Sequence, residues 1–470
     1  MVGLLSQGLL RFTTSWLVGR LAGRAVLGTV QTAMSTATLL ALMGPTSVGS
    51  AASKYLARAR ATEDHDELLA VAAHLRRRGS VLAGLLAVVG VVFWVRYDDG
   101  TWVDALWVGI FTAAYSGYSF TRGVQFGTGQ VRRATAWDVI SAVGGIVVLL
   151  VALTAGARGA ALLLPLSLSY AAYTVAGWPR VGSRPAPLAP ALRRELDEVI
   201  ALGVAGTLAS AGFLQISMIV ANGTGAEGAG QFAAAMATAT PASLLAVSLS
   251  LALFPSLAQA WARGDRDLFR DQTDRAARVL MVIMVTVLGS LAICSALVMR
   301  VLWGPGFDAE SPILPTLLLA IMLTTVAVPS VNALITRSRQ HMVITTGASF
   351  AGLCTGAVVW WSLTPGITAE GVAIGFLAGS VVSGTTPLLA EWRIGRHRWT
   401  WVVLRMPLAV GLVLATILAL RALDAPMWWE PIAALGFCVV WWGMCHRDLG
   451  LVPWASLRRM GGQGEANDPG

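Results

Sequence analysis

The sequence predicts an all-α integral membrane protein with about fourteen transmembrane helices. Hydrophobic residues fill 56% of the 470 positions and charged residues only 13%, which is more apolar surface than one soluble core can bury. Apolar stretches of about 17 to 25 residues recur along the whole chain, and each is long enough to cross a hydrocarbon layer of roughly 30 Å as a helix. Most of the 34 lysines and arginines fall in alternate loops, as expected for a multi-pass protein.

The apolar stretches define the expected spans in chain order. They run near 4–21, 29–53, 80–96, 105–127, 135–154, 160–178, 199–221, 231–258, 279–302, 312–335, 343–363, 369–390, 403–422 and 429–446. The first stretch lacks a small-residue cleavage site, so we expect it to be retained as a span rather than removed as a signal peptide. Pro45, Pro241, Pro255 and Pro329 each remove a backbone donor inside a predicted span and can bend the helix there, either as a gating bend or as a static kink.

The distribution of charge between loops predicts the orientation. If the N-terminus is cytoplasmic, the cations that fall on the outside are few: Arg20, Arg24, Arg96, Arg158, Arg300 and Arg421. This bias predicts that both termini lie in the cytoplasm. The net charge of +9 then reflects inside loops, so we expect membrane lipids rather than nucleic acid as partners.

No motif for metal, redox or nucleotide chemistry stands out. Cys294, Cys354, Cys438 and Cys445 are scattered through apolar stretches without the paired spacing of a zinc or redox site, so neither a metal nor a cofactor is expected. A Gly-x-x-x-x-Gly-Lys-Ser/Thr loop is missing and Lys54 is the only lysine, which argues against an ATP-driven pump.

Two regions of the chain repeat each other. The sequence AMSTAT at 33–38 matches AMATAT at 235–240, and each predicted helix runs into a charged loop. Six spans precede the proline-rich linker at 180–190, so both halves share one orientation. We therefore expect two parallel six-helix lobes around a central cleft, followed by two extra helices and a cytoplasmic tail; the domains are 1–190, 191–395 and 396–470. An old duplication in a rigid receptor or enzyme is the alternative.

Three glycine-rich regions carry a family resemblance. They are GRLAGRAVLG at 19–28, NGTGAEGAGQF at 222–232 with LFPSLA at 253–258, and FTRG at 120–123 with Gly127 and Gly129. Together they resemble the multidrug/oligosaccharidyl-lipid/polysaccharide (MOP) flippase superfamily, in its polysaccharide-exporter branch. The resemblance covers nearly the whole chain and includes the two extra C-terminal spans.

The resemblance implies a non-enzymatic secondary transporter in a bacterial cytoplasmic membrane. It would flip a polyprenyl-diphosphate-linked oligosaccharide, with lipid II among the candidates, from the inner to the outer leaflet by alternating access, for cell-wall or surface polysaccharide assembly. Polysaccharide synthesis enzymes are further candidate partners. The alternatives are a cation-coupled multidrug antiporter of the same superfamily, a membrane glycosyltransferase or polymerase that acts on lipid-linked sugars, and a structural scaffold.

Charges inside the predicted spans are the candidate site residues, because a charge near the bilayer centre costs at least about 2.5 to 3.5 kcal/mol. Arg11, Arg20 and Arg24 fall within roughly 100° on a helical wheel and would form one basic stripe. With Lys54 and Arg58, such a stripe offers charge-assisted hydrogen bonds to a diphosphate. Snorkelling of these side chains to the headgroups is the alternative.

Further candidates lie deeper along the chain. Arg122 and Gln125 fall in the fourth span, and Gln215 and Asn332 are amides suited to sugar hydroxyls or to interhelical hydrogen bonds. Asp138 is the one clear intramembrane carboxylate and the candidate for cation coupling. Because it lies five residues after Arg133, an interfacial ion pair or a helix-start contact is favoured over a cation site. The predominance of arginine over acid in the spans favours an anionic substrate over a cationic drug.

Overall fold

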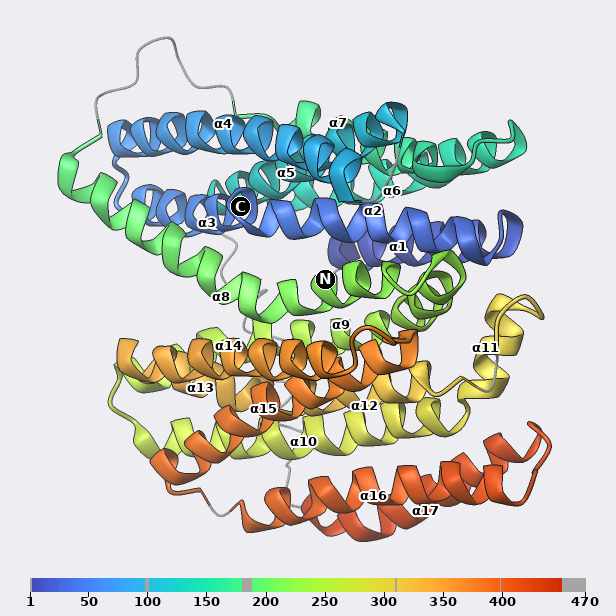
Figure 1. The fold of residues 1–470 in the computed structure, drawn as a ribbon. Coiled ribbons are helices and arrows are strands. Elements are labelled where there is room, and N and C mark those ends of the chain that lie inside the picture. The colour runs from blue at the N-terminus through green and yellow to red at the C-terminus, as the bar shows by residue number, and fades with distance from the viewer. Residues whose placement is uncertain (1, 98–100, 180–187, 309–310, 398, 450–470) are drawn as a thin grey trace. The chain divides into compact units, whose positions relative to one another are not determined.

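The computed structural model describes residues 2–97, 101–179, 188–308, 311–397 and 399–449 (Figure 1). Over these residues the chain consists of seventeen α-helices and one short 3-10 helix, which confirms the all-α fold class. Most of the predicted linker (180–187) and the end of the predicted tail (450–470) lie outside the described residues.

Contacts divide the chain into two compact units. Unit 1 comprises the described residues up to Thr238 together with Pro365–Val372, and unit 2 comprises those of Ala239–Thr364 and those from Ala373 onward. The boundaries of the lobes proposed from the sequence stay a prediction.

Unit 1 holds the first eight helices and the start of the ninth. Its elements are α1 (Val2–Leu21), α2 (Arg24–Leu42), α3 (Pro45–Ala61), α4 (His65–Tyr97), α5 (Trp102–Gly127), α6 (Val131–Thr154), η1 (Gly159–Leu163), α7 (Leu164–Gly177), α8 (Pro190–Asn222) and the beginning of α9 (Ala226–Ala262).

Unit 2 continues from within α9. Its further elements are α10 (Arg266–Ile293), α11 (Ser295–Trp303), α12 (Ile313–Val326), α13 (Val328–Arg337), α14 (Arg339–Ser362), α15 (Ala369–Gly395), α16 (Thr400–Ala422) and α17 (Trp429–Leu449); the first residues of α15 belong to unit 1.

Every predicted span falls on helix, but four spans are divided between two helices: 29–53, 160–178, 279–302 and 312–335. The span 231–258 stays within the single helix α9, although it contains Pro241 and Pro255. The stretch 29–53 is divided between α2 and α3, with Pro45 at the start of α3, and 312–335 is divided between α12 and α13, with Pro329 in the first turn of α13. Proline is tolerated there because the first turn of a helix has no partner for the missing N–H. In the described residues, ten helices are long and apolar enough to cross a membrane, so the count of fourteen stays a prediction.

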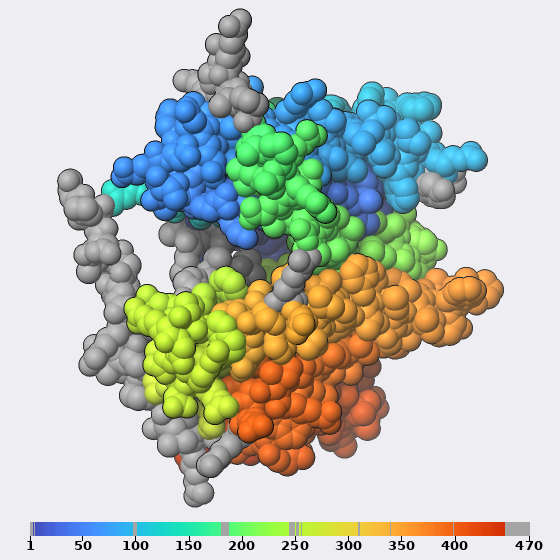
Figure 2. All heavy atoms as spheres, turned by 90° about the vertical axis from the view of Figure 1, so that its left-hand side faces the viewer, coloured from blue at the N-terminus to red at the C-terminus, as the bar shows by residue number. Residues whose placement is uncertain are grey.

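Close helix packing in unit 1 depends on small residues. A side chain at Gly123 of α5 would collide with the backbone carbonyl of Gly49 on α3, so the two helices approach closely only because both positions are glycine. Beside this contact lies a buried apolar core to which α3, α4, α5 and α8 contribute Tyr55, Leu75, Phe120 and Leu196. Figure 2 shows the green atoms of α8 lying against the blue atoms of α3 and α4.

A chain of buried polar contacts joins four segments of unit 2. Arg337 of α13 donates twice to the Glu391 carboxylate on α15, at 2.6 and 3.1 Å. His397, in the α15–α16 connection, lies with Nε2 2.8 Å from Glu391 Oε1 and Nδ1 2.6 Å from Asp274 Oδ1 on α10. Trp399 donates to the same Asp274 oxygen at 2.5 Å and stacks on the imidazole. The contacts therefore fix the start of α16 to the rest of unit 2.

The position of His397 predicts a pH-dependent stability. Burial alone lowers the pKa of His397, but hydrogen bonds to Asp274 and Glu391 outweigh it and raise the pKa above its ordinary value. The stabilisation is thus fully present below the ordinary pKa and is lost as the pH rises through the raised pKa of the folded protein. We expect the thermal unfolding midpoint of purified protein to fall over that range, and His397→Gln to remove this dependence.

The exposed His446 provides the matched control, because it contacts no carboxylate among the described residues. His446→Gln should retain the wild-type pH profile. An unchanged profile in His397→Gln would contradict this assignment.

Candidate functional site

A buried polar cluster lies in unit 1 where α1, α5, α6 and α7 pack together (Figure 1). We call it the N-terminal polar cluster. Its members are Gln7 and Arg11 of α1, Tyr115, Tyr118, Arg122 and Gln125 of α5, Asp138 and Ser141 of α6, and Tyr170 and Tyr173 of α7.

The carboxylate of Asp138 organises one half of the cluster. Asp138 is 0% exposed, and both of its carboxylate oxygens accept a hydrogen bond: Tyr118 donates to Oδ1 at 3.0 Å and Arg122 Nε donates to Oδ2 at 3.3 Å. Gln7 donates to the Asp138 backbone carbonyl at 2.8 Å and to Ser141 Oγ at 3.2 Å. A carboxylate with these partners is satisfied away from water, as a buried charge must be.

Arg11 occupies the other half among aromatic rings. Its Nε donates to the Tyr170 hydroxyl at 2.9 Å, and its guanidinium lies 4.6 Å from the centre of the Tyr115 ring and 5.9 Å from that of Tyr170. Cation–π contacts and a neutral hydroxyl hold the charge in place without neutralising it. Arg11 makes no ion pair with any described residue, and its Nη2 is buried without a hydrogen-bond partner there.

Amide groups add further unused hydrogen-bonding capacity. Tyr173 donates to Gln125 Oε1 at 2.6 Å, which leaves Gln125 Nε2 buried and without a partner among the described residues. Gln7 Oε1 is in the same state. Buried polar atoms without partners are costly, so these two amides, like Arg11 Nη2, have hydrogen-bonding capacity for a polar ligand or water.

The charge balance of the cluster is positive. Arg122 and Asp138 compensate each other, whereas Arg11 has no acidic counterpart in the described part of the chain. One cation is therefore left in surplus inside a membrane protein, and the arrangement can attract a phosphate or another anion.

The structure brings together four of the residues that the sequence singled out: Arg11, Arg122, Gln125 and Asp138. Asp138 does form an ion pair, but its partner is Arg122 and not Arg133. Arg133 instead donates to the Ala176 carbonyl at 3.0 Å, and Arg122, which lies on a different helix, takes the carboxylate.

The predicted basic stripe along one helix is also wrong. The helix α1 ends at Leu21, and Gly23 adopts a φ of 93°, a left-handed conformation that glycine adopts without strain. Arg24 is therefore the first residue of α2 and does not share the face of Arg11; it pairs with Glu227 at the start of α9. Arg20 is exposed at the end of α1.

The remaining candidates lie outside the cluster. Lys54 is exposed, with its ammonium 5.3 Å from the centre of the Tyr55 ring, and Arg58 pairs with Glu67 at 3.1 Å and Glu195 at 3.6 Å. Gln215 is half-buried on α8. Asn332 belongs to unit 2, where its Nδ2 donates to Ser250 at 2.8 Å.

Sequence reasoning missed the four tyrosines of the cluster, although a signal was present. Tyr115 and Tyr118, like Tyr170 and Tyr173, are three residues apart and so share a helix face. These two pairs account for four of the six tyrosines in the chain. Tyr115, Tyr118 and Arg122 follow one another at spacings of three and four, which places the tyrosines of α5 on the same face as its arginine.

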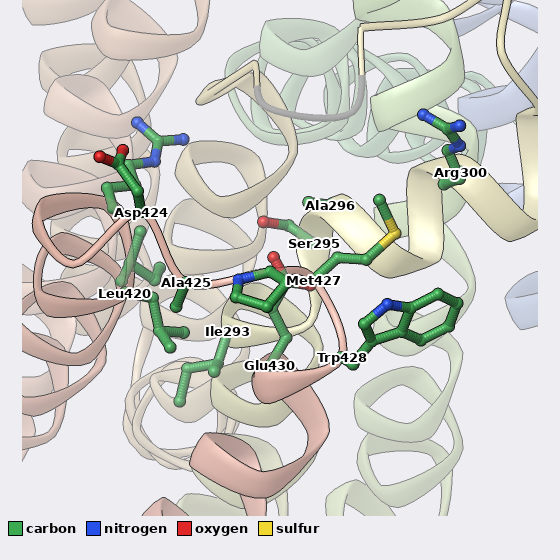
Figure 3. Close-up of a pocket in the computed structure, with 13 residues that line it drawn as sticks. Ile293, Ser295, Ala296, Arg300, Leu420, Asp424, Ala425, Met427, Trp428 and Glu430 are labelled. Carbon is green, nitrogen blue, oxygen red and sulfur yellow. The ribbon is translucent and has the colours of Figure 1, made fainter.

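A cavity of about 620 Å³ in unit 2 contains none of the predicted site residues. Figure 3 shows it between the α10–α11 turn and the α16–α17 connection, with Arg300, Asp424 and Glu430 around it. Glu430 accepts a hydrogen bond from the Leu297 backbone N–H at 2.9 Å and so satisfies a donor at the start of α11. This carboxylate serves the fold, and the N-terminal polar cluster is the stronger candidate site.

Comparisons with known proteins agree with the fold. Residues 139–312 match the family model described as lipid II flippase MurJ. The structure of lipid II flippase MurJ in an inward closed conformation is similar with a TM-score of 0.69 and 11% identity, over 95% of this chain and 98% of that one. No curated protein matches the sequence.

Two other solved structures are also similar. An inward-facing multidrug resistance MATE family transporter of the MOP superfamily gives a TM-score of 0.63 at 17% identity, over 86% of this chain and 95% of that one. A MOP superfamily transporter from Pyrococcus furiosus gives a TM-score of 0.60 at 16% identity, over 87% of this chain and 94% of that one. The chain therefore shares the fold of these transporters, as the resemblance drawn from its sequence implied.

The Arg122–Asp138 pair predicts a measurable coupling. Asp138→Asn leaves Arg122 without its counter-charge, and we expect a loss of about 3 kcal/mol, the lower end for breaking a buried pair, because Arg122 is partly exposed. The double variant Arg122→Gln/Asp138→Asn restores neutrality and should be less destabilised than Asp138→Asn alone. Thermal unfolding of wild type, Arg122→Gln, Asp138→Asn and the double variant in detergent measures the coupling, and strictly additive effects would argue against the pair.

Proposed function

We propose that this multi-pass membrane protein is a secondary transporter that flips a polyprenyl-diphosphate-linked oligosaccharide from the inner to the outer leaflet. The substrate is a precursor of cell wall or surface polysaccharide, with lipid II as one candidate. We place the protein in a bacterial cytoplasmic membrane, with fourteen spans, both termini in the cytoplasm and two six-helix lobes that work by alternating access. The lipid-linked saccharide is its partner, and the protein itself carries out no covalent chemistry.

The surplus charge of the N-terminal polar cluster carries this proposal. A lipid-linked diphosphate needs cations and hydrogen-bond donors within the membrane, and Arg11 offers a guanidinium whose charge no described carboxylate neutralises. Arginine suits the task because its planar donors match phosphate oxygens and its charge persists when it is buried. Gln125, with an unused amide donor, is positioned to contact a sugar or phosphate oxygen.

The comparisons support the same substrate class. The matching family model is described as a lipid II flippase, and its match begins next to Asp138 and extends from α6 to beyond α11. The structural likeness to that flippase extends over nearly the full length of both chains.

We propose that Asp138 couples transport to a cation, with a proton as the simplest choice. In the structure its carboxylate is the counter-ion of Arg122. Protonation of Asp138 would remove that negative charge, so that Arg122 could join Arg11 in binding a diphosphate. Arg20, Arg24, Lys54, Gln215 and Asn332 remain candidate contacts for other parts of the substrate.

A cation-coupled multidrug antiporter is the second candidate function. It is favoured by the likeness to MATE transporters and by the buried acid at position 138. The existing partners of that acid count against it, since Tyr118 and Arg122 already occupy both carboxylate oxygens. A cationic drug would have to compete with an arginine, which disfavours this alternative.

The direct test is a leaflet-resolved measurement of polyprenyl-diphosphate sugars in cells depleted of the protein. We expect one such lipid to accumulate facing the cytoplasm, and we expect wild-type protein and Arg263→Ala to relieve the accumulation. Arg11→Ala should fail to relieve it, because the uncompensated cation is lost. Arg263 is an exposed arginine of unit 2 and so provides a matched loss of charge outside the cluster.

Two outcomes would contradict the proposal. Unchanged lipid-linked sugars together with new sensitivity to cationic drugs would favour the antiporter. Full relief by Arg11→Ala, at wild-type protein levels, would remove the N-terminal polar cluster as the binding site even if the substrate class were correct.

A further inference from the structure

A basic pocket opens between α4 and α8 of unit 1, away from the N-terminal polar cluster. Its volume is about 620 Å³, and the two helices meet on the face that Figure 2 shows. The lining residues are His74, Arg77, Arg78, Val81 and Leu82 of α4 with Arg193 and Asp197 of α8.

The pocket contains more cationic than anionic side chains. Arg78 pairs with Asp197 across the two helices, so these charges balance. Arg77 and Arg193 are exposed, and neither makes an ion pair with a described residue. His74 adds a ring nitrogen, Nε2, that is buried without a hydrogen-bond partner in the described part of the chain. Two free guanidinium groups beside an unused imidazole nitrogen form a binding place for a phosphate.

An apolar surface continues from the cations along α4. Val81, Leu85, Val88 and Val92 follow Arg77 at spacings of four, four, three and four, which places all five on one helix face. Each of these four apolar side chains is more than half exposed. A cation followed by about three turns of exposed apolar helix matches an amphiphile with an anionic head and a hydrocarbon tail.

We propose that this pocket binds the phosphate headgroup of an anionic phospholipid, with an acyl chain along the exposed face of α4. A free phosphate would meet the same cations but would leave the apolar face uncovered, so the lipid fits better. The distribution of arginines predicts that this end of the protein is cytoplasmic, where anionic lipids attract basic pockets between transmembrane helices. The site is independent of the transported substrate, because it shares no residue with the N-terminal polar cluster.

The test is native mass spectrometry of the full-length protein with phosphatidylglycerol or phosphatidylcholine. We expect wild-type protein to retain phosphatidylglycerol preferentially. Arg77→Ala/Arg193→Ala should lower its affinity roughly ten- to thirty-fold, the loss expected for two cations near an anionic surface. Arg263→Ala/Arg270→Ala removes two exposed arginines of unit 2 and should leave the affinity unchanged.

A second measurement guards against altered folding. Phosphatidylglycerol should raise the unfolding temperature of wild-type protein and of the Arg263/Arg270 control, but not that of the Arg77/Arg193 variant, whose unfolding temperature in phosphatidylcholine should equal that of wild type. Equal lipid retention in the two double variants would overturn the proposal. So would binding of inorganic phosphate alone to wild-type protein in phosphatidylcholine with no preference for anionic lipid, because the ligand would then be a free anion.

Discussion

The constraint on which unit 1 depends is the cost of keeping Arg11, Arg122 and Asp138 inside a membrane protein. Charges in this setting persist only when other groups replace water around them. Four helices supply these groups. The carboxylate belongs to α6, and α5 provides the tyrosine and the arginine that donate to it. A glutamine of α1 donates to the backbone of Asp138, and a tyrosine hydroxyl of α7 accepts a hydrogen bond from Arg11. The same contacts therefore determine both the packing of α1, α5, α6 and α7 and the chemistry of the N-terminal polar cluster.

The N-terminal polar cluster has one positive charge in surplus, and this surplus indicates its function. A purely structural network would gain by pairing every cation with an acid, whereas Arg11 is held only by aromatic faces and a hydroxyl. An uncompensated arginine is suited to a ligand that brings its own negative charge. Movement of such a ligand outward across an inside-negative membrane is downhill by about 2.3 kcal/mol per charge for each 100 mV, so the membrane potential would assist export.

The sequence predicted the helices well because apolar length and proline carry that information locally. Every predicted span lies on helix, and Pro45 and Pro329, which lack a backbone donor, stand where two of the spans are divided, whereas Pro241 and Pro255 lie within the continuous helix α9. It also indicated Arg11, Arg122, Gln125 and Asp138, because charged and amide side chains are rare in apolar helices. It could not pair them, since the partner of Asp138 lies on another helix and depends on packing. The prediction that Arg24 shares a helix face with Arg11 was wrong for a local reason: Gly23 adopts a left-handed conformation between α1 and α2.

The most direct measurement of the central claim is ligand preference in the purified protein. Native mass spectrometry can compare a polyprenyl diphosphate with the corresponding neutral polyprenol and with a lipophilic cation of similar size. If the uncompensated Arg11 is the anchor, wild-type protein should prefer the diphosphate, and Arg11→Ala should lose this preference while still binding the polyprenol. Equal binding of diphosphate and polyprenol by wild-type protein, or a preference for the cation, would contradict the claim that the N-terminal polar cluster recognises an anionic lipid.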